Sequence, residues 1–127
     1  MAATILVLED DAALRELLCE VLEDEGHHVV TATTLPGLLQ QMPPTPDLLI
    51  SDMLFDLKPL GLEAISAVRS TAQRSLPAIL CTAATTYLER YQEQINRLGA
   101  VVLSKPFTID GLLTAVNSAL DPRPVCA

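Results

Sequence analysis

Polar side chains suited to phosphoryl chemistry follow four separate apolar runs of this sequence. In chain order they are Glu9-Asp10-Asp11, Asp52, Thr82 and Lys105, each behind a short run of Val, Leu, Ile or Ala. If those runs are neighbouring parallel strands, the polar groups meet at one edge of a sheet, where open α/β sheets bind ligands. Several carboxylates beside one ammonium group suit a hard divalent cation and a phosphoryl group. The first hypothesis is therefore phosphoryl transfer.

Each group has a role in the attack of a carboxylate on a phosphoryl donor. Asp52 stands alone at a strand end and is the best nucleophile. Glu9 and Asp10 are adjacent acids that can hold Mg²⁺, one directly and the other through water. Thr82 can donate a hydroxyl, and Lys105 supplies a positive charge. The formal charges of the three carboxylates are then balanced by those of Mg²⁺ and Lys105, whereas without a metal the carboxylates repel one another.

Taken singly, these residues also have ordinary structural explanations. Asp11 is better placed to cap a helix than to bind a metal. Asp52 alone could be a turn residue at a strand end, but the joint placement of the set on four strand ends is harder to explain structurally. His27 and His28 fall at a helix-to-strand turn away from this edge, so we interpret them as surface residues rather than ligands.

The elements that must position these groups alternate along the chain. Short apolar runs predict strands, and runs with 3.6-residue periodicity predict helices. Strands are expected at 4–9, 28–32, 47–51, 78–82 and 100–104, and helices at 12–25, 35–42, 62–71, 86–98 and 109–120. This (βα)5 pattern predicts an α/β fold, a doubly wound parallel sheet in the strand order 2-1-3-4-5.

Composition narrows the possible classes of function. The chain has 127 residues and a formal net charge of −8, which favours one domain and argues against direct nucleic-acid binding. We expect the domain to cover 1–120, with 121–127 a tail or the start of a linker. No apolar run approaches the length of a membrane span, and the three cysteines have no metal-like spacing. A reduced, cytoplasmic setting without a membrane is therefore expected.

Four motifs together resemble the receiver domain of bacterial two-component response regulators. They are Ile-Leu-Val-Leu-Glu9-Asp10-Asp11, Asp-Leu-Leu-Ile-Ser-Asp52, Cys81-Thr82-Ala83 and Ser104-Lys105-Pro106-Phe107. Each is weak alone, but they occur in the family's order and the similarity extends over about residues 4–120. The resemblance implies a flavodoxin-like fold.

The resemblance also implies the roles of individual residues. Asp52 would accept a phosphoryl group from the phosphohistidine of a histidine kinase or phosphotransfer protein. Mg²⁺ would be held by Asp10, Asp52 and the backbone carbonyl of Leu54, with Glu9 acting through water. Thr82 and Lys105 would contact the phosphoryl group, and the bond from Lys105 to Pro106 would be cis.

The resemblance implies a signalling protein rather than a metabolic enzyme. It would catalyse only its own phosphoryl transfer and a slow autodephosphorylation. Phosphorylation would switch its conformation, and the face formed by helix 4, strand 5 and helix 5 would contact an output domain or partner protein. A homodimer formed on phosphorylation is left open.

Several positions depart from the family's pattern. Asp56 stands where the family usually has Pro, and the loop to Gly61 is one residue longer. Val102 replaces an aromatic residue on the fifth strand, so signal transmission is expected to depend more on the fourth helix, including Tyr87 and Tyr91. Leu54 and Ala84 match the positions that flank the attacking water, and neither can orient it. Slow loss of the phosphoryl group is therefore expected.

Two other classes of function remain as alternatives. A scaffold that binds partners without being phosphorylated would not need the complete set of five polar residues. A phosphohydrolase with an aspartyl nucleophile would be expected to carry a second Asp two residues after Asp52, and this chain has Leu54 there. A nucleotide or flavin binder is disfavoured because no GxGxxG motif follows the first strand.

Overall fold

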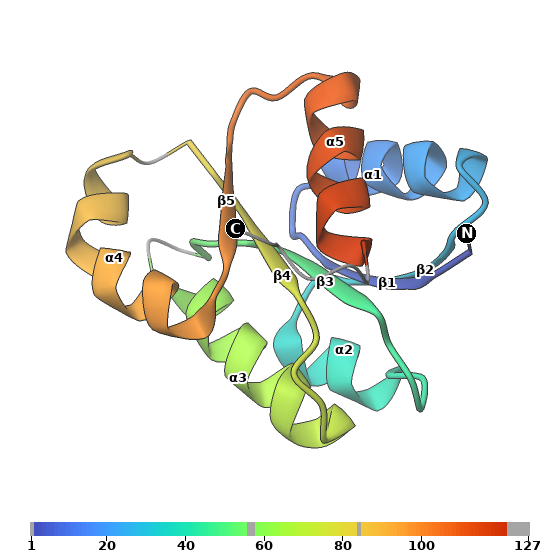
Figure 1. Ribbon diagram of the computed structural model, residues 1–127, viewed down its shortest axis with the longest axis horizontal. Helices are drawn as coiled ribbons and strands as arrows, with labels where there is room; N and C mark the ends of the chain where they lie inside the picture. The colour runs from blue at the N-terminus through green and yellow to red at the C-terminus, as the bar shows by residue number, and fades with distance from the viewer. Residues whose placement is uncertain (1, 56–57, 84, 122–127) are drawn as a thin grey trace.

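The protein folds around a parallel sheet of five strands in the order β2-β1-β3-β4-β5 (Figure 1). The computed structural model describes residues 2–55, 58–83 and 85–121, and for 85–87 it describes the backbone only. The strands are β1 (Thr4–Leu8), β2 (His28–Ala32), β3 (Leu48–Asp52), β4 (Ala78–Thr82) and β5 (Val101–Ser104). The helices are α1 (Ala12–Asp24), α2 (Leu35–Gln40), α3 (Leu60–Ala72), α4 (Thr85–Leu98) and α5 (Ile109–Leu120). The predicted fold class and strand order are confirmed.

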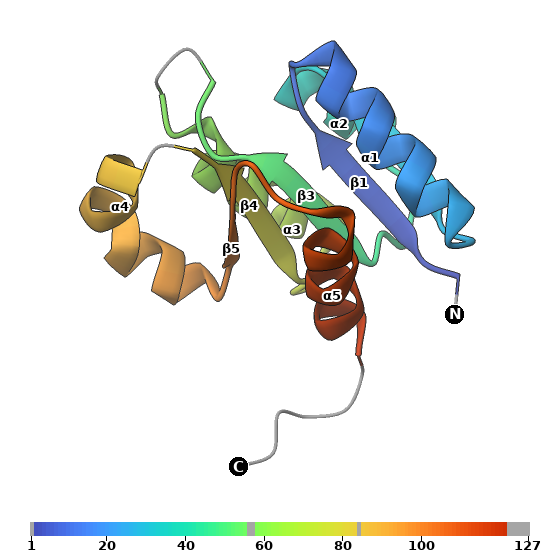
Figure 2. The ribbon, with the colours of Figure 1, turned by 90° about the horizontal axis from the view of Figure 1, so that it is seen from above.

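Helices cover both faces of the sheet, which explains why its central strands are apolar throughout. Helices α1 and α5 lie on one face, and α2, α3 and α4 lie on the other (Figures 1 and 2). Each face has its own aliphatic core. The first contains Leu18, Leu22, Leu112 and Val116 from the helices, and the second contains Leu38, Ile65, Val68 and Ile95.

Polar side chains mark the starts of several helices, and glycines follow the ends of two of them. The side chains of Asp11, Thr34 and Thr108 accept hydrogen bonds from backbone N–H groups at the starts of α1, α2 and α5. Such bonds satisfy donors that have no partner within the helix. Gly26 and Gly99 follow α1 and α4 with positive φ values of 92° and 65°, as helix-terminating glycines commonly do.

The predicted boundaries were wrong at several element ends. Strand β3 includes Asp52, whereas the prediction ended that strand one residue earlier. Helix α3 begins at Leu60 rather than at residue 62, and α2 ends at Gln40 rather than at residue 42. Helix ends are set by local hydrogen bonding, which periodicity alone does not reveal.

In the described part of the chain, none of the helices is both long enough and apolar enough to cross a membrane.

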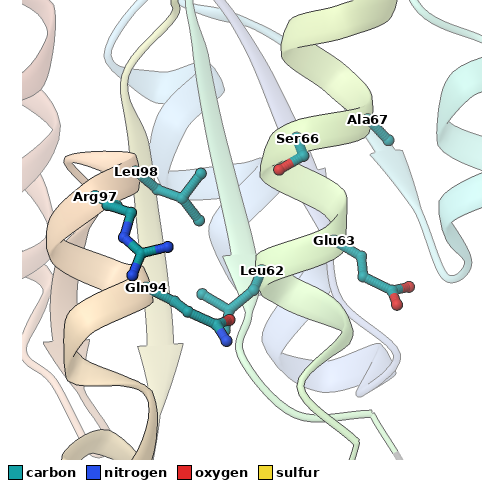
Figure 3. Close-up of a pocket in the computed structure, with 7 residues that line it drawn as sticks. All are labelled: Leu62, Glu63, Ser66, Ala67, Gln94, Arg97 and Leu98. Atoms are coloured by element: carbon teal, nitrogen blue, oxygen red, sulfur yellow. The ribbon is translucent and has the colours of Figure 1, made fainter.

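The C-terminal end of α4 is attached to α3 by Arg69. The Arg69 guanidinium donates to the carbonyl of Leu76 at 2.9 Å and to that of Leu98, the last residue of α4, at 2.7 Å. Beside this attachment the two helices are separated by a pocket of about 570 Å³. Leu62 of α3 and Gln94 of α4 extend into it from opposite sides (Figure 3). The Arg69 contact and the pocket therefore both lie at the C-terminal half of α4.

Replacing Arg69 by Met should lower the free energy of unfolding by about 1.5–3 kcal/mol, because two charge-assisted hydrogen bonds are lost while the aliphatic stem remains. Urea denaturation measures this change. Arg97→Met is the matched control, since it removes an exposed pair with Glu93 on α4 and should change stability by about 0.5 kcal/mol or less. Equal effects of the two substitutions would contradict the role given to Arg69.

Candidate functional site

The ends of four strands bring the predicted polar residues together at one edge of the sheet. The ammonium of Lys105, just beyond β5, lies 3.3 Å from Glu9 Oε1 and 3.5 Å from Asp52 Oδ1. The side chains of Glu9 and Asp52 are only 2% and 15% exposed, so these pairs are largely shielded from water. Residues separated by almost the whole chain therefore form one charged site.

Glu9 is fixed by its neighbours on three sides. Its backbone N–H donates to the carbonyl of Ala32 at the end of β2, and its own carbonyl accepts from the guanidinium of Arg15. Its second carboxylate oxygen accepts from the backbone N–H of Asp11 at 3.2 Å. Because these contacts set both the backbone and the carboxylate, Glu9 has little freedom to turn away from the site.

Three carboxylates form a group that could hold a metal ion. Glu9, Asp10 and Asp52 each offer an oxygen, and these atoms lie within 4.8 Å of one another. Asp10 is exposed, whereas Glu9 is buried, so the group has a solvent side and a protein side. A cluster of carboxylate oxygens with access to water fits Mg²⁺, which retains several waters in proteins.

Burial dominates the electrostatics of the two inner carboxyl groups. It raises the pKa of Glu9 and of Asp52 above their ordinary values, because a buried carboxylate loses hydration. The Lys105 ammonium opposes this shift at both groups. The backbone N–H of Leu54 also opposes it by hydrogen bonding the Asp52 carboxylate, while the negative charge of Asp10 adds to it. The pKa of Asp52 thus remains raised despite its partners.

The charges act in the opposite sense on Lys105. Burial alone would lower the pKa of its ammonium group, but the carboxylates of Asp52 and Glu9 outweigh burial and raise it. Lys105 is therefore a permanent cation at the site. The neighbouring thiol of Cys81 is buried in the core, which raises its pKa to about 12, so it stays protonated.

Thr82 closes β4 between the strands that carry Asp52 and Lys105. Cys81 is the register partner of Asp52, and Thr82 is the partner of Ser104. Thr82 is 2% exposed, and its carbonyl accepts the backbone N–H of Lys105 at 2.9 Å. The predicted cis bond between Lys105 and Pro106 is present. These contacts tie the β5–α5 connection to the end of β4.

Gly61 allows the loop after Asp52 to return closely to β3. Its N–H donates to the carbonyl of Met53 at 3.0 Å. A Cβ atom at this position would lie 2.4 Å from the Asp52 carbonyl oxygen and 2.8 Å from Met53 Cα. Backbone atoms cannot yield to such a contact, so only glycine fits. The return of the chain beside Asp52 thus depends on a missing side chain.

The structure brings together Glu9, Asp10, Asp52, Thr82 and Lys105, the five residues that the sequence placed at strand ends. Leu54 is adjacent to them through its N–H bond to Asp52, while a role for its carbonyl stays a prediction.

Three other residues that the sequence singled out lie outside the described part of the structure: Asp56, Ala84 and the side chain of Tyr87. His27 does not belong to this cluster. Its Nδ1 accepts the N–H of Ala3 at the other end of β1.

Sequence reasoning missed the contact of Arg15 with the Glu9 carbonyl. The sequence carried a weak signal for it, because Arg15 lies on the first turn of the helix that follows Glu9. It also missed the pairing of Phe55 with Lys58 inside the loop after β3, where each backbone N–H donates to the other's carbonyl. No residue type in that loop is specific for such a pair.

Comparison with known proteins gives a consistent answer. Residues 5–117 match the family model of the response regulator receiver domain. The phosphate regulon transcriptional regulatory protein PhoB of Klebsiella pneumoniae is 30% identical over 122 residues, which cover 94% of this chain and 52% of that protein. The KDP operon transcriptional regulatory protein KdpE of Escherichia coli is 32% identical, with 91% and 50% covered. The chain thus spans about half the length of these curated relatives.

Solved structures agree with this match. The chemotaxis protein CheY4 of Vibrio cholerae superposes with a TM-score of 0.79 at 27% identity, covering 94% of this chain and all of that one. NtrX from Brucella abortus gives a TM-score of 0.79 at 30% identity, covering 94% of this chain and 28% of that one. With the matching family model, the conclusion is that this chain belongs to the response regulator receiver domains of two-component signalling systems.

Proposed function

We propose that this receiver domain accepts a phosphoryl group on Asp52 in a Mg²⁺-dependent reaction and changes conformation as a result. The observation that carries the proposal is the position of Lys105. Its ammonium lies 3.3 Å from Glu9 and 3.5 Å from Asp52, beside a cluster of three carboxylates. Carboxylate oxygens for a metal, a fixed cation and an acceptor aspartate are the parts that transfer to a carboxylate requires.

In this proposal Asp10, Asp52 and the Leu54 carbonyl hold Mg²⁺, and Glu9 acts through a water. The metal would neutralise charge on the phosphoryl oxygens when bound. An Asp52 carboxylate oxygen attacks phosphorus, the bond from phosphorus to the donor's imidazole nitrogen breaks, and that nitrogen keeps the electron pair. Lys105 and Thr82 contact the transferred group, and the Lys105 charge offsets the added negative charge of the product.

The phosphoryl group should be lost slowly. Hydrolysis needs a water aligned opposite the leaving carboxylate. Leu54, one of the two positions matched to the water-flanking residues of the family, has a side chain without hydrogen-bonding groups. The other is Ala84. In this proposal the domain is a signalling phosphoacceptor, and the only reactions it catalyses are its own phosphorylation and the slow loss of that phosphoryl group.

The proposed partners follow from the family and from the net charge. A histidine kinase or phosphotransfer protein supplies the phosphoryl group, and the face of α4, β5 and α5 contacts an output domain or partner protein. A homodimer formed on phosphorylation is left open. The net charge of −8 disfavours nucleic-acid binding by this domain. The domain would occupy 1–120 in a cytoplasmic protein, and 121–127 would be a tail or lead into a linker.

Asp52→Asn should abolish acid-labile labelling by acetyl phosphate in the presence of Mg²⁺, because the amide is a poor nucleophile. Incorporation of radioactive phosphate, removed by hydroxylamine, measures this. Asp47→Asn is a matched control: Asp47 binds the Thr4 N–H at the opposite end of the sheet, and its loss should leave labelling unchanged. Labelling of Asp52→Asn at the wild-type level would exclude Asp52 as the acceptor.

The raised carboxyl pKa values predict a pH-dependent effect of the same substitution on stability without metal. A carboxyl group whose pKa is raised on folding stabilises the fold at low pH and loses that contribution as pH rises through its folded pKa. At neutral pH the Asp52 charge is thus unfavourable, although Lys105 offsets part of it. Asp52→Asn should therefore raise the melting temperature by a few degrees at neutral pH, and this gain should shrink as the pH falls toward the usual carboxyl range.

Calorimetry at several pH values, with chelator present, measures this gain. Adding Mg²⁺ should then stabilise the wild type more than the variant, because a bound ligand stabilises the folded state. A gain that grows toward acid pH would contradict the electrostatic argument.

Switching should be concentrated in the 83–91 segment rather than in β5. Val102 is partly buried against the core and, as a β-branched residue, has few rotamers with which to respond. Helix α4 is anchored at its end by Arg69 and bordered by an open pocket along α3. The Arg69 contact thus restrains the C-terminal end of α4.

Amide NMR shifts with and without beryllofluoride, a phosphoryl mimic, measure this distribution. The largest changes should fall within 83–91, and Asp52→Asn should show none. Changes centred on Val101–Leu103, with 83–91 silent, would contradict the prediction.

A further inference from the structure

The loop after β3 is closed near Asp52 by one pair of backbone hydrogen bonds and by one further backbone hydrogen bond. The outer pair joins Phe55 and Lys58: the Phe55 N–H donates to the Lys58 carbonyl at 2.9 Å, and the Lys58 N–H donates to the Phe55 carbonyl at 3.0 Å. The inner contact joins the Gly61 N–H to the Met53 carbonyl at 3.0 Å. Leu54 lies between these two closures, so its backbone is held from both sides.

The outer pair fixes the direction of the Leu54 carbonyl. That carbonyl and the Phe55 N–H belong to one planar peptide unit, and in a trans unit they point in opposite directions. Among the described residues the one cis bond is at Pro106, so the Leu54–Phe55 unit is trans. Because the Phe55 N–H is directed at Lys58, the Leu54 carbonyl is directed to the other side. The preceding peptide unit is also held, since the Leu54 N–H bonds the Asp52 carboxylate.

The Phe55 side chain anchors this arrangement in the core. It is 9% exposed and belongs to the same aliphatic cluster as Leu8 of β1 and Leu62 of α3. It also lines a small pocket together with Asp10 and Leu60, so the anchor lies next to the acidic cluster. A buried aromatic ring limits how far its own backbone can turn. Phe55 thus connects the hydrophobic core to the backbone beside Asp52.

We propose that Phe55 and its backbone pairing with Lys58 are positioning elements that aim the Leu54 carbonyl at the metal held by Asp10 and Asp52. The inference rests on the proposed function, since that function supplies the metal. It assigns to this loop, which is one residue longer than the family's usual loop, a means of keeping a backbone ligand in place. Supporting groups of this kind commonly change metal affinity by tenfold or more when they are removed.

The test compares Phe55→Ala with Leu38→Ala. Leu38 is a fully buried residue of the same core cluster on α2, and its loss reports the effect of a core cavity alone. Phe55→Ala should raise the dissociation constant for Mg²⁺ about tenfold, whereas Leu38→Ala should change it less than about twofold. Phe55→Leu, which keeps an apolar anchor and guards against failure of the alanine variant to fold, should lie between wild type and Phe55→Ala. Calorimetric titration measures the constants.

A second measurement needs no metal. Amide hydrogen exchange at Leu54 and Phe55 in the metal-free protein should accelerate in Phe55→Ala and stay near the wild-type rate in Leu38→Ala, after correction for global stability. Absence of Mg²⁺ binding by the wild type would overturn the proposed function, and with it the metal-directed role of Phe55. Mg²⁺ binding by the wild type with an equal constant in Phe55→Ala, or unchanged exchange in that variant, would overturn the positioning role while leaving the proposed function intact.

Discussion

The site depends on holding two shielded carboxylates against their mutual repulsion. Glu9 and Asp52 lie at the ends of adjacent strands β1 and β3, and burial already disfavours the charge on each. Lys105 offsets both charges, but it must do so from β5, beyond the intervening β4. Parallel strands are about 4.8 Å apart, so β5 and β3 are separated by about 10 Å. A long lysine side chain can bridge this separation together with the carboxylate that faces it.

Much of the fold supports the ion pairs that Lys105 makes with Glu9 and Asp52. Strand β4 ends in Thr82, a small residue, and the Thr82 carbonyl holds the N–H of Lys105. Glu9 is fixed by β2, by α1 through Arg15 and by the turn at Asp11. The two aliphatic cores hold the strands in register from either side. A shift of one residue between β3 and β4 would give Asp52 a register partner other than Cys81 and reverse the faces of every side chain on that strand.

The sequence was sufficient for the fold class, the strand order and the five polar residues of the site. Apolar runs and helical periodicity indicate which side chains are buried, and they therefore predict the strands and helices. Polar residues directly after the strands are expected at the edge of the sheet where ligands bind. It placed element ends less well. Leu60 and Gly61 join α3 through hydrogen bonds to Lys58 and Met53, and these bonds depend on the loop's path rather than on residue type.

The remaining part of the site is built from backbone, which explains why residue types did not reveal it. The N–H of Leu54 on Asp52, the N–H of Asp11 on Glu9 and the pairing of Phe55 with Lys58 use groups that nearly every residue carries. The return of the β3–α3 loop beside Asp52 depends on Gly61, where a missing Cβ is a sequence feature with a single structural meaning. A glycine of this kind constrains the carbonyls next to it, so its position carries information on the backbone surroundings of Asp52.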